Sequence, residues 1–446
     1  MLGENQSATE NNLGIIEFSM RRKILIISPH YPPSNLAAVH RSRLFAQHLP
    51  DFGWEPIVLT VHEDYYEEEL DHNIEQLLPK GQRIEKVKAF RIRRPRLIGD
   101  IGLRGFFQLR KKALKLLRSE NIHFVYIPIP SFYASLIGSY LHRKTGVKYG
   151  IDYIDPWVHI FPGSEKRFSR HWWSTLLAKY LEPKAIKHAS IITGVAEGYY
   201  LGILDRNPAL QKTCLFGAMP YGAERLDHEQ VVKMAITPYL FEPKSNVLQL
   251  VYAGAFLPKA LEPLRQLFSA IAASKDLYKD VVFHFIGTGS LANDPGSYRI
   301  KPLAEEYGIW NTIVKEYPAR IPYLDVLVHL EAADGVFILG STEAHYTPSK
   351  VYQAVLSSKP VLAVLHNQSS AADILEKTKA GLVLRFQGKD ELGKIGAEFN
   401  HLFVRYRSFC KKFVSEQVHL TAFDQYSARN VTADLVELLN KVVKKV

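Results

Sequence analysis

Residues 345–363 of this chain read HYTPSKVYQAVLSSKPVLA. An apolar segment precedes them at 335–339 (GVFIL), and a second one, beginning inside the stretch, covers 361–365. Both are typical of buried strands. Between the two, Thr347 suits a helix N-cap, Pro348 suits the first helical position and Pro360 ends the helix. The stretch therefore predicts a strand, loop, helix, strand unit.

The start of the predicted helix carries groups that bind anions. Its free amide groups and its dipole attract negative charge. Ser349 adds a hydroxyl and Lys350 adds a full positive charge, while Gln353 lies three residues on, on the same face. A diphosphate on the amides with a ribose hydroxyl near Gln353 fits this arrangement. An ordinary capped helix with a solvated lysine fits it as well.

The stretch resembles the nucleotide-sugar loop of GT-B glycosyltransferases, above all the retaining family 4 type. The PSK-x-Y-x motif of one branch is intact at 348–353, and the GKPV turn becomes SKPV at 358–361. That family commonly carries a pair of glutamates in this loop, and the resemblance places His345 and Gln353 at their positions. It implies donor contacts from the following residues: His345, Thr347, Ser349, Lys350 and Gln353.

Length and composition predict a globular protein of two ordinary domains. The chain has 446 residues, of which 47% are apolar. Two distant cysteines, Cys214 and Cys410, make neither a disulfide scaffold nor a metal site, so a reducing compartment is expected. Residues 1–20 are polar, lack a signal-peptide core and are expected to be disordered. The chain contains no run of about 18 apolar residues, which is the length that predicts a membrane span, so we expect a cytoplasmic protein.

Positive charge is concentrated between residues 80 and 120. This segment holds fourteen Lys/Arg against three Asp/Glu, and the formal net charge of the whole chain is +11. Residues 106–118 mix apolar and basic side chains at helical spacing. They form either a domain helix with a solvated basic face or a patch for anionic lipids, peripheral on the inner membrane face. Nucleic acid is not expected, because the aromatic residues are not interleaved as stacking platforms.

The first half opens like a doubly wound domain. Apolar segments at 23–28 and 55–60 predict strands, with a loop and a helix between them. Family 4 enzymes resemble this arrangement, with a Gly-Gly turn at the helix start that approaches the donor phosphates. Here Ala37 and Ala38 replace the two glycines. The resemblance places Ala38 in donor binding, although two methyl groups hinder close approach of a phosphate to the backbone.

Asp152 and Asp155 lie at or near the end of another predicted strand, 148–154, which follows one at 123–129. Functional groups of doubly wound sheets gather at the carboxyl ends of strands. Family 4 relatives have an Asp- or His-containing signature here, and the resemblance implies that Asp155 and His159 face the sugar. Without the resemblance, Asp155 and the following proline would be a plain turn.

The second domain is predicted to open with a strand at 248–253 and a loop. In family 4 that loop carries an Arg/Lys pair that neutralises the donor diphosphate. Here Ala255 replaces the Arg, and Lys259 can stand for the Lys. Further strands are predicted at 281–289, 312–317 and 380–386.

We therefore expect an α/β protein of GT-B architecture, with two Rossmann-like doubly wound domains that face a central cleft. The expected divisions are a disordered tail at 1–20, an acceptor domain at 21–222, a linker at 223–246, a nucleotide-sugar domain at 247–425 and a closing helix at 426–446.

The expected function is transfer of a hexose from a nucleotide sugar to a glycan, lipid-linked or polysaccharide acceptor, with retention. Asp155, His159 and Lys350 are the expected catalytic residues. We expect no metal site and no cofactor beyond the donor substrate. Two alternatives remain: a GT-B sugar-nucleotide epimerase, and a degenerate relative that binds a nucleotide sugar without catalysis.

Overall fold

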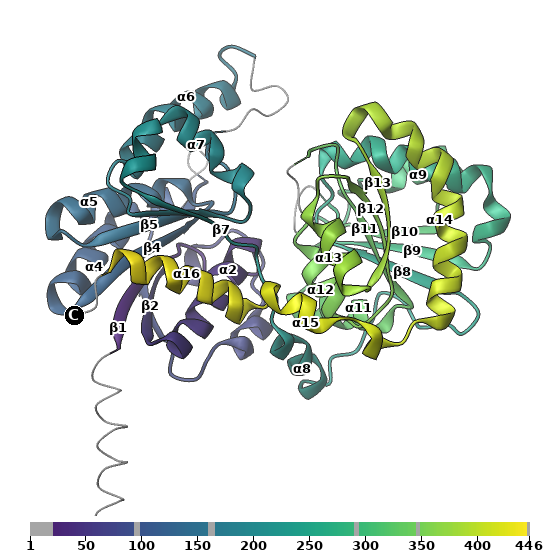
Figure 1. Cartoon of the computed structure of the whole chain (residues 1–446), viewed down its shortest axis with the longest axis horizontal. Coiled ribbons are helices and arrows are strands. Elements are labelled where there is room, and N and C mark those ends of the chain that lie inside the picture. The colour runs from purple at the N-terminus through teal and green to yellow at the C-terminus, as the bar shows by residue number, and fades with distance from the viewer. Residues whose placement is uncertain (1–20, 93–98, 159–165, 290–293, 345–347, 444–446) are drawn as a thin grey trace, which may run out of the picture. The chain divides into compact units, whose positions relative to one another are not determined.

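The computed structural model describes residues 21–92, 99–158, 166–289, 294–344 and 348–443. The chain forms two compact units, each built on its own parallel sheet (Figure 1). Unit 1 comprises residues 1–70, 78–221 and 428–446, and unit 2 comprises residues 71–77 and 222–427. The predicted pair of Rossmann-like doubly wound domains is confirmed.

Unit 1 contains a seven-stranded sheet in the order β3-β2-β1-β4-β5-β6-β7. Every strand pair is parallel, with Ile26 of β1 opposite Val58 of β2 and Tyr126 of β4. The strands are β1 (Arg22–Ile27), β2 (Trp54–Val61), β3 (Arg83–Val87), β4 (Ile122–Ile129), β5 (Lys148–Tyr153), β6 (Ile191–Gly194) and β7 (Leu215–Ala218).

Helices cover both faces of this sheet, which explains why its central strands are continuous apolar runs. One face packs on α4 and α5, through Leu109 and Ile137, and the other on α2 and α16, through Phe45 and Leu435. The helices of unit 1 are α2 (Ala37–His48), α3 (Ile101–Arg104), α4 (Phe106–Ser119), α5 (Ser135–Thr145), α6 (Arg170–Ile186), α7 (Leu201–Arg206) and α16 (Ala428–Val442).

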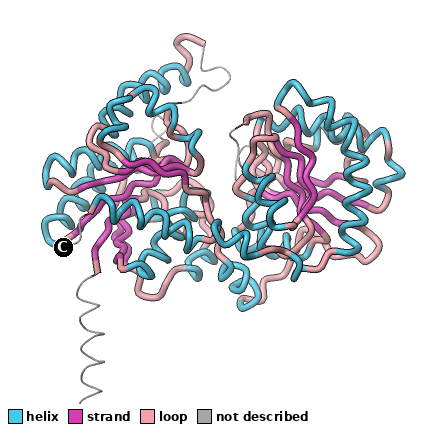
Figure 2. Tube along the Cα trace, in the orientation of Figure 1, coloured by secondary structure: helices cyan, strands magenta, loops and turns pink. Residues whose placement is uncertain are grey.

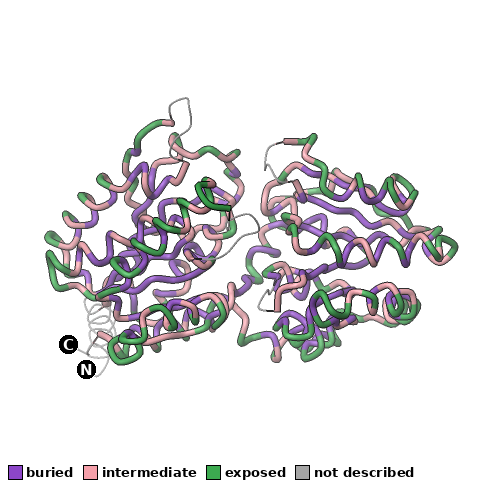
Figure 3. The backbone as a smooth tube through the Cα atoms, turned by 90° about the horizontal axis from the view of Figure 1, so that it is seen from above, coloured by how far each residue is buried: buried purple, intermediate pink, exposed green. Residues whose placement is uncertain are grey.

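Unit 2 contains a six-stranded parallel sheet in the order β10-β9-β8-β11-β12-β13. The central strands of this sheet are buried in the middle of the unit (Figures 2 and 3). The strands are β8 (Leu248–Ala253), β9 (Val281–Ile286), β10 (Val314–Tyr317), β11 (Gly335–Leu339), β12 (Val361–His366) and β13 (Gly381–Phe386).

An aromatic core fills one side of this second sheet. Phe283 and Phe285 of β9 pack with Phe268 of α9 and with Phe399 and Phe403 of α14. The helices of unit 2 are α8 (Arg225–Lys233), α9 (Leu261–Ala273), α10 (Lys301–Glu306), α11 (Tyr323–Ala332), α12 (Lys350–Leu356), α13 (Ser370–Thr378), α14 (Leu392–Lys412) and α15 (Leu420–Phe423).

Three segments belong to units that chain order does not suggest. The closing helix α16 belongs to unit 1, although it follows the whole of unit 2. Residues 71–77 belong to unit 2, where the Asp71 carboxylate accepts a hydrogen bond of 2.7 Å from the first amide of α11. The stretch expected as a linker, 223–246, contains α8, whose polar residues Asp227 and His228 are buried within unit 2.

Candidate functional site

The topology of unit 2 points to the carboxyl ends of β8 and β11. From these two central strands the sheet grows in opposite directions, to β9 and β10 on one side and to β12 and β13 on the other. Doubly wound sheets bind ligands outside the carboxyl ends of the strands at such a switch point. The loops after the two strands lie together, because the Thr342 amide donates a 3.2 Å hydrogen bond to the Lys259 carbonyl.

Lys350, the first residue of α12, places its ammonium at this edge of the sheet. Its Nζ lies 3.6 Å from the centre of the Tyr252 ring, is shielded from solvent and has no hydrogen-bond partner among the described residues. The backbone passes close by at Gly254, where a Cβ would lie 3.5 Å from Nζ. Burial lowers the pKa of Lys350 to about 7. A buried ammonium is costly without a counter-charge, so the position suits an anionic ligand.

The helix itself contributes less than the sequence predicted. It begins at Lys350, two residues later than expected, because the turn before it closes with an i to i+3 bond from the Val351 amide to the Pro348 carbonyl. Ser349 is exposed and its side chain caps no amide. Thr347 and His345 lie outside the described residues. With seven residues, α12 has a weak dipole, and the Lys350 side chain is the main source of positive charge.

Lys259 differs from Lys350 in having a partner. Its Nζ lies 2.5 Å from a carboxylate oxygen of Glu343, in the loop after β11, and both side chains are partly exposed. The pair carries almost no net charge, and an ion pair in contact with solvent contributes little to the free energy of folding. The diphosphate role expected for Lys259 would require the ligand to compete with Glu343.

Gln353 takes part in a chain of hydrogen bonds among α8, α11 and α12. Its Oε1 lies 2.8 Å from Nε2 of His228, and its Nε2 donates to the Tyr323 hydroxyl over 2.8 Å. The chain ends on two carboxylates, Glu331 at 2.7 Å from His228 Nδ1 and Asp227 at 2.9 Å from the Tyr323 hydroxyl. Each amide atom of Gln353 keeps one further hydrogen-bonding position for a ligand.

The Asp227 carboxylate fixes the direction of the hydrogen bonds at Tyr323. Tyr323 donates its proton to Asp227 and therefore accepts from the Gln353 amide nitrogen. The Gln353 oxygen then faces Nε2 of His228, whose other ring nitrogen, Nδ1, lies against the Glu331 carboxylate. Gln353 is thus held by a histidine on one side and a tyrosine on the other.

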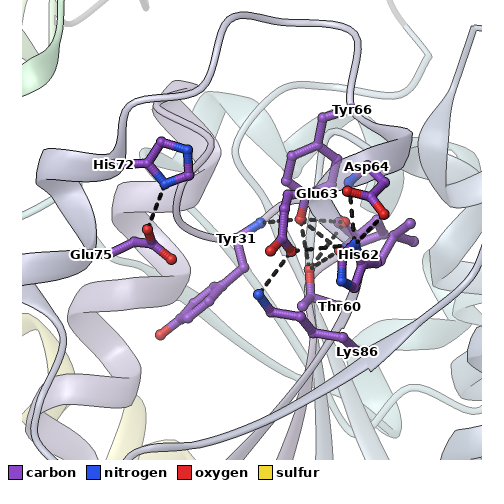
Figure 4. Close-up of polar contacts among 11 residues, drawn as sticks. Tyr31, Thr60, His62, Glu63, Asp64, Tyr66, His72, Glu75 and Lys86 are labelled. Atoms are coloured by element: carbon purple, nitrogen blue, oxygen red, sulfur yellow. Dashed lines mark hydrogen bonds and ion pairs between the residues drawn. The ribbon is translucent and has the colours of Figure 1, made fainter.

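In unit 1 the switch point lies between β1 and β4, and several polar groups there lie against partners of their own unit. His30, in the loop after β1, lies 2.9 Å from Glu68, which also accepts from the Ser34 hydroxyl. Burial alone would raise the pKa of Glu68, but these partners outweigh it and lower the pKa to about 2. The Tyr66 hydroxyl fixes the same loop by accepting from the Tyr31 amide over 3.0 Å (Figure 4).

A buried ion pair lies deeper in unit 1. Arg41 of α2 donates to both carboxylate oxygens of Asp152, over 2.7 and 3.0 Å, and neither side chain is exposed. The Thr193 hydroxyl adds a bond of 2.8 Å to the same carboxylate, and Arg41 also donates to the Pro220 carbonyl. Asp152 is therefore a structural anchor. Ala38, expected at the donor phosphates, lies half-buried one turn before Arg41.

Asp155 lies two residues past the end of β5. Lost hydration raises the pKa of its carboxyl to about 6, although the residue as a whole is exposed and solvent access moderates this rise. The half-buried Tyr221 is close enough to interact with it electrostatically. A carboxyl whose pKa is near neutrality suits proton transfer. His159, expected beside it, lies outside the described residues.

The basic segment has a largely structural apolar side. Leu109, Ala113 and Leu116 of α4 are buried in the core of unit 1, whereas Phe107 is 58% exposed. Arg104 is buried and donates to the carbonyls of Phe90 and Tyr65. Further cations of the segment have acidic partners, such as Lys112 with Glu85 at 2.6 Å.

Metal centres and membrane spans are both absent from the described residues. No group of three or more His, Cys, Asp or Glu among them is arranged to hold a metal ion. No helix in the described part of the chain is long and apolar enough to cross a membrane.

Comparison with known proteins shows a likeness of structure. No family model and no curated protein matches the chain. A glycosyltransferase from Rickettsia africae is 14% identical, covers 96% of this chain and 100% of its own, and has a TM-score of 0.60. Anabaena HepE in complex with UDP-glucose is 14% identical, with coverages of 94% and 99% and a TM-score of 0.60. The α,α-trehalose 6-phosphate synthase of Burkholderia multivorans is 10% identical, with coverages of 95% and 99% and a TM-score of 0.62.

These likenesses establish a GT-B-type fold, as the sequence predicted. The neighbours include a glycosyltransferase and synthases of sucrose phosphate and trehalose 6-phosphate, and HepE was solved with UDP or UDP-glucose. At such identities the similarity carries the fold, and the activity of this chain has to be argued from its own residues.

Several polar residues of these two edges were not expected from the sequence. They are His30, Glu68, Arg41, His228, Tyr323 and Glu343. Gln353 and His228 are 125 residues apart, and Arg41 and Asp152 are 111 apart, so no local pattern relates them. The one signal that was available is the HYPP loop after the first strand, which contains His30.

Proposed function

We propose that this chain is a glycosyltransferase of the hexosyl type, which moves a sugar from a nucleotide-sugar donor to a glycan, lipid-linked or polysaccharide acceptor with retention. The observation that carries the proposal is the unpaired, buried ammonium of Lys350 at the switch point of unit 2, as seen among the described residues. The structural neighbours with bound UDP and UDP-glucose support it.

The chemistry assigns a clear task to Lys350. When the bond between the anomeric carbon and the diphosphate breaks, the leaving oxygen gains negative charge. A buried ammonium stabilises that charge more in the transition state than in the bound donor, because it is already oriented and poorly hydrated. Lys259, Ser349 and Thr347 would complete the diphosphate contacts, while Gln353 and His345 would contact ribose and sugar.

Asp155 is the proposed acceptor-side residue, with His159 as its neighbour in that role. The cations exposed between residues 80 and 120 would hold a polyanionic acceptor or an anionic membrane surface. We propose a cytoplasmic location, with a peripheral fraction on the inner membrane face.

A specific observation favours a second mechanism. His30 stands in the loop after β1, with its Nδ1 2.9 Å from a carboxylate oxygen of Glu68. A histidine held by a carboxylate is a suitable general base for an acceptor hydroxyl, and direct attack by that hydroxyl would invert the anomeric configuration. The anomeric configuration of the product, read by NMR, separates the two mechanisms.

The test of the proposed function is release of nucleoside diphosphate from a panel of nucleotide sugars, beginning with UDP-glucose. Release that requires a glycan acceptor, and that falls further in Lys350→Met than in Lys259→Met, is the expected result. Tight donor binding without any release would instead support the degenerate binding protein, for which the Lys259–Glu343 pair is the motivating feature. Conversion of the donor without acceptor would support the epimerase.

A further inference from the structure

The outward face of α6 carries apolar side chains at the spacing of a buried helix. Trp173, Leu176, Leu177 and Tyr180 follow each other at i, i+3, i+4 and i+7, and therefore share one face. The opposite face packs into unit 1 through Ala178, Glu182, Ala185 and Ile186. Neighbours at this spacing normally point toward a core, yet here they point toward solvent.

The exposed fractions of these side chains are large. They are 56% for Trp173, 42% for Leu176, 43% for Leu177 and 64% for Tyr180. Phe168, just before the helix, is 76% exposed and has a φ of 63°, a left-handed conformation that bulky residues rarely adopt. Its ring lies 5.5 Å from that of Trp172, which lies 4.8 Å from that of Trp173. A continuous exposed surface of this kind marks an interaction site.

The charges around this surface are of one sign. Residues 166–187 contain six Lys/Arg, all exposed, and their one acidic residue is Glu182. Glu182 is 1% exposed and paired with Arg206 of α7, so it adds no negative charge to the outer surface. Lys184 and Lys187 continue the apolar face toward the carboxyl end of the helix, and Lys184 lies over the Tyr180 ring at 3.5 Å.

We propose that the outer face of α6, from Phe168 to Lys187, docks on a bilayer surface that contains anionic lipids. Tryptophan and tyrosine favour the boundary between headgroups and acyl chains, leucine and phenylalanine insert below it, and flanking lysines and arginines pair with anionic headgroups. The face docks the protein in the plane of the membrane without crossing it.

The same charges argue against a second copy of this chain as the occupant. A two-fold contact through α6 would bring the same surface together twice, and with it two sets of exposed cations without an exposed acid in 166–187 to pair with them. The face of α4 is also a weaker candidate, because Leu109, Ala113 and Leu116 are buried in the core.

Co-sedimentation of the full chain with vesicles tests the proposal without any donor or acceptor. We expect binding to phosphatidylcholine vesicles that contain phosphatidylglycerol, weaker binding to phosphatidylcholine alone, and a decline with salt. The double variant Trp173→Ser/Leu177→Ser should lower the partition at least tenfold while leaving the thermal midpoint unchanged, since both side chains are exposed. Val404→Ser, at a residue 52% exposed, is the matched control that should bind normally, whereas Phe107→Ser reports on the basic segment 80–120.

Quenching by brominated lipid supplies a second readout. Trp54 and Trp157 are buried, so quenching that disappears in a Trp172→Phe/Trp173→Phe variant places α6 in the bilayer. No sedimentation with anionic vesicles, or undiminished sedimentation of the double variant, overturns the proposal. Loss of binding in Phe107→Ser reassigns docking to the basic segment 80–120. A dimer in sedimentation velocity that Trp173→Ser dissociates reassigns the face to a second copy.

Discussion

The carboxyl ends of the central strands differ between the two sheets in how their charged side chains are paired. In unit 1 the polar groups near the carboxyl ends of the central strands are matched internally, as in the pairs Arg41–Asp152 and His30–Glu68. In unit 2 the corresponding edge holds Lys350, whose ammonium is buried and unpaired among the described residues. One topology thus produces a closed network in one unit and an open positive site in the other. The difference indicates that an anion is better accommodated by unit 2.

Breaking the closed network should have the largest effect on stability. Asp152→Ala leaves the Arg41 guanidinium buried without its carboxylate, so we expect the free energy of unfolding of unit 1 to fall by about 3–5 kcal/mol. Urea unfolding followed by the fluorescence of the buried Trp54 and Trp157 measures this loss. The exposed pair Glu437–Lys441 is the matched control, and Glu437→Ala should leave the curve unchanged. A similarly small change for Asp152→Ala would show that water reaches Arg41.

Asp155 tests whether a loop of unit 1 also serves catalysis. Asp155→Asn should reduce turnover about 10²-fold or more, the usual contribution of a general acid or base, with little change in donor affinity. In the wild type, activity should fall as the pH drops through about 6, because the pKa of the Asp155 carboxyl is raised to that value and the carboxylate becomes protonated there. A rate–pH profile checks both. Normal turnover of the variant would make Asp155 a structural turn, and loss of its folding would do the same.

Loss of the positive charge from the open site of unit 2 should weaken donor binding without lowering stability, in contrast to the loss of Asp152. Lys350→Met should weaken UDP-glucose binding by about 1–3 kcal/mol, the range for a charge-assisted contact. The same change should not destabilise the free protein, because the lysine is buried without a counter-charge among the described residues. Lys259→Met, at a solvent-exposed pair, is the control and should change affinity less. Equal affinities of all three proteins would move the diphosphate away from Lys350.

The pH dependence of the same binding reaction sharpens this result. The pKa of Lys350 is lowered to about 7 in the free protein, so the side chain is charged below that pH and largely neutral above it. Bound diphosphate favours the charged form, and binding above pH 7 therefore takes up a proton. Affinity for UDP-glucose should fall as the pH rises from about 7 to about 9, across the range in which the free lysine is neutral. Calorimetry in two buffers measures the proton, and Lys350→Met should abolish its uptake.

How far the sequence predicted these features depends on whether a signal is local. The strand at 335–339 was predicted with the observed bounds of β11, because burial on both faces produces a continuous apolar run. The edge strand β3 was missed, since Arg83–Val87 is half-exposed and carries charges. Lys350 was singled out from its motif, but its burial depends on Tyr252 and Gly254, which lie far earlier in the chain. The roles of Gln353 and α8 were likewise hidden, because their partners are brought together only by folding.

Gln353 gives the smallest and most discriminating test. In Gln353→Glu a carboxylate would replace the amide that donates to Tyr323, and the single tyrosine proton would then face two carboxylates, the introduced one and that of Asp227. A carboxylate three residues from Lys350 would also give the ammonium a counter-charge that competes with the donor diphosphate. We therefore expect UDP-glucose binding to weaken tenfold or more, about 1.4 kcal/mol.

The control for this last change is Gln425→Glu, which adds the same charge at an exposed position of unit 2 and should leave affinity unchanged. His228→Gln extends the test, because it removes the imidazole that contacts the Gln353 oxygen while keeping a donor of similar reach. If Gln353→Glu binds UDP-glucose equally well or more tightly, the amide is a simple replacement for the family 4 glutamate. If affinity falls as expected, the hydrogen-bond partners on α8 and α11 require an amide at position 353. UDP-glucose binding at the open positive site of unit 2 then depends on keeping that amide.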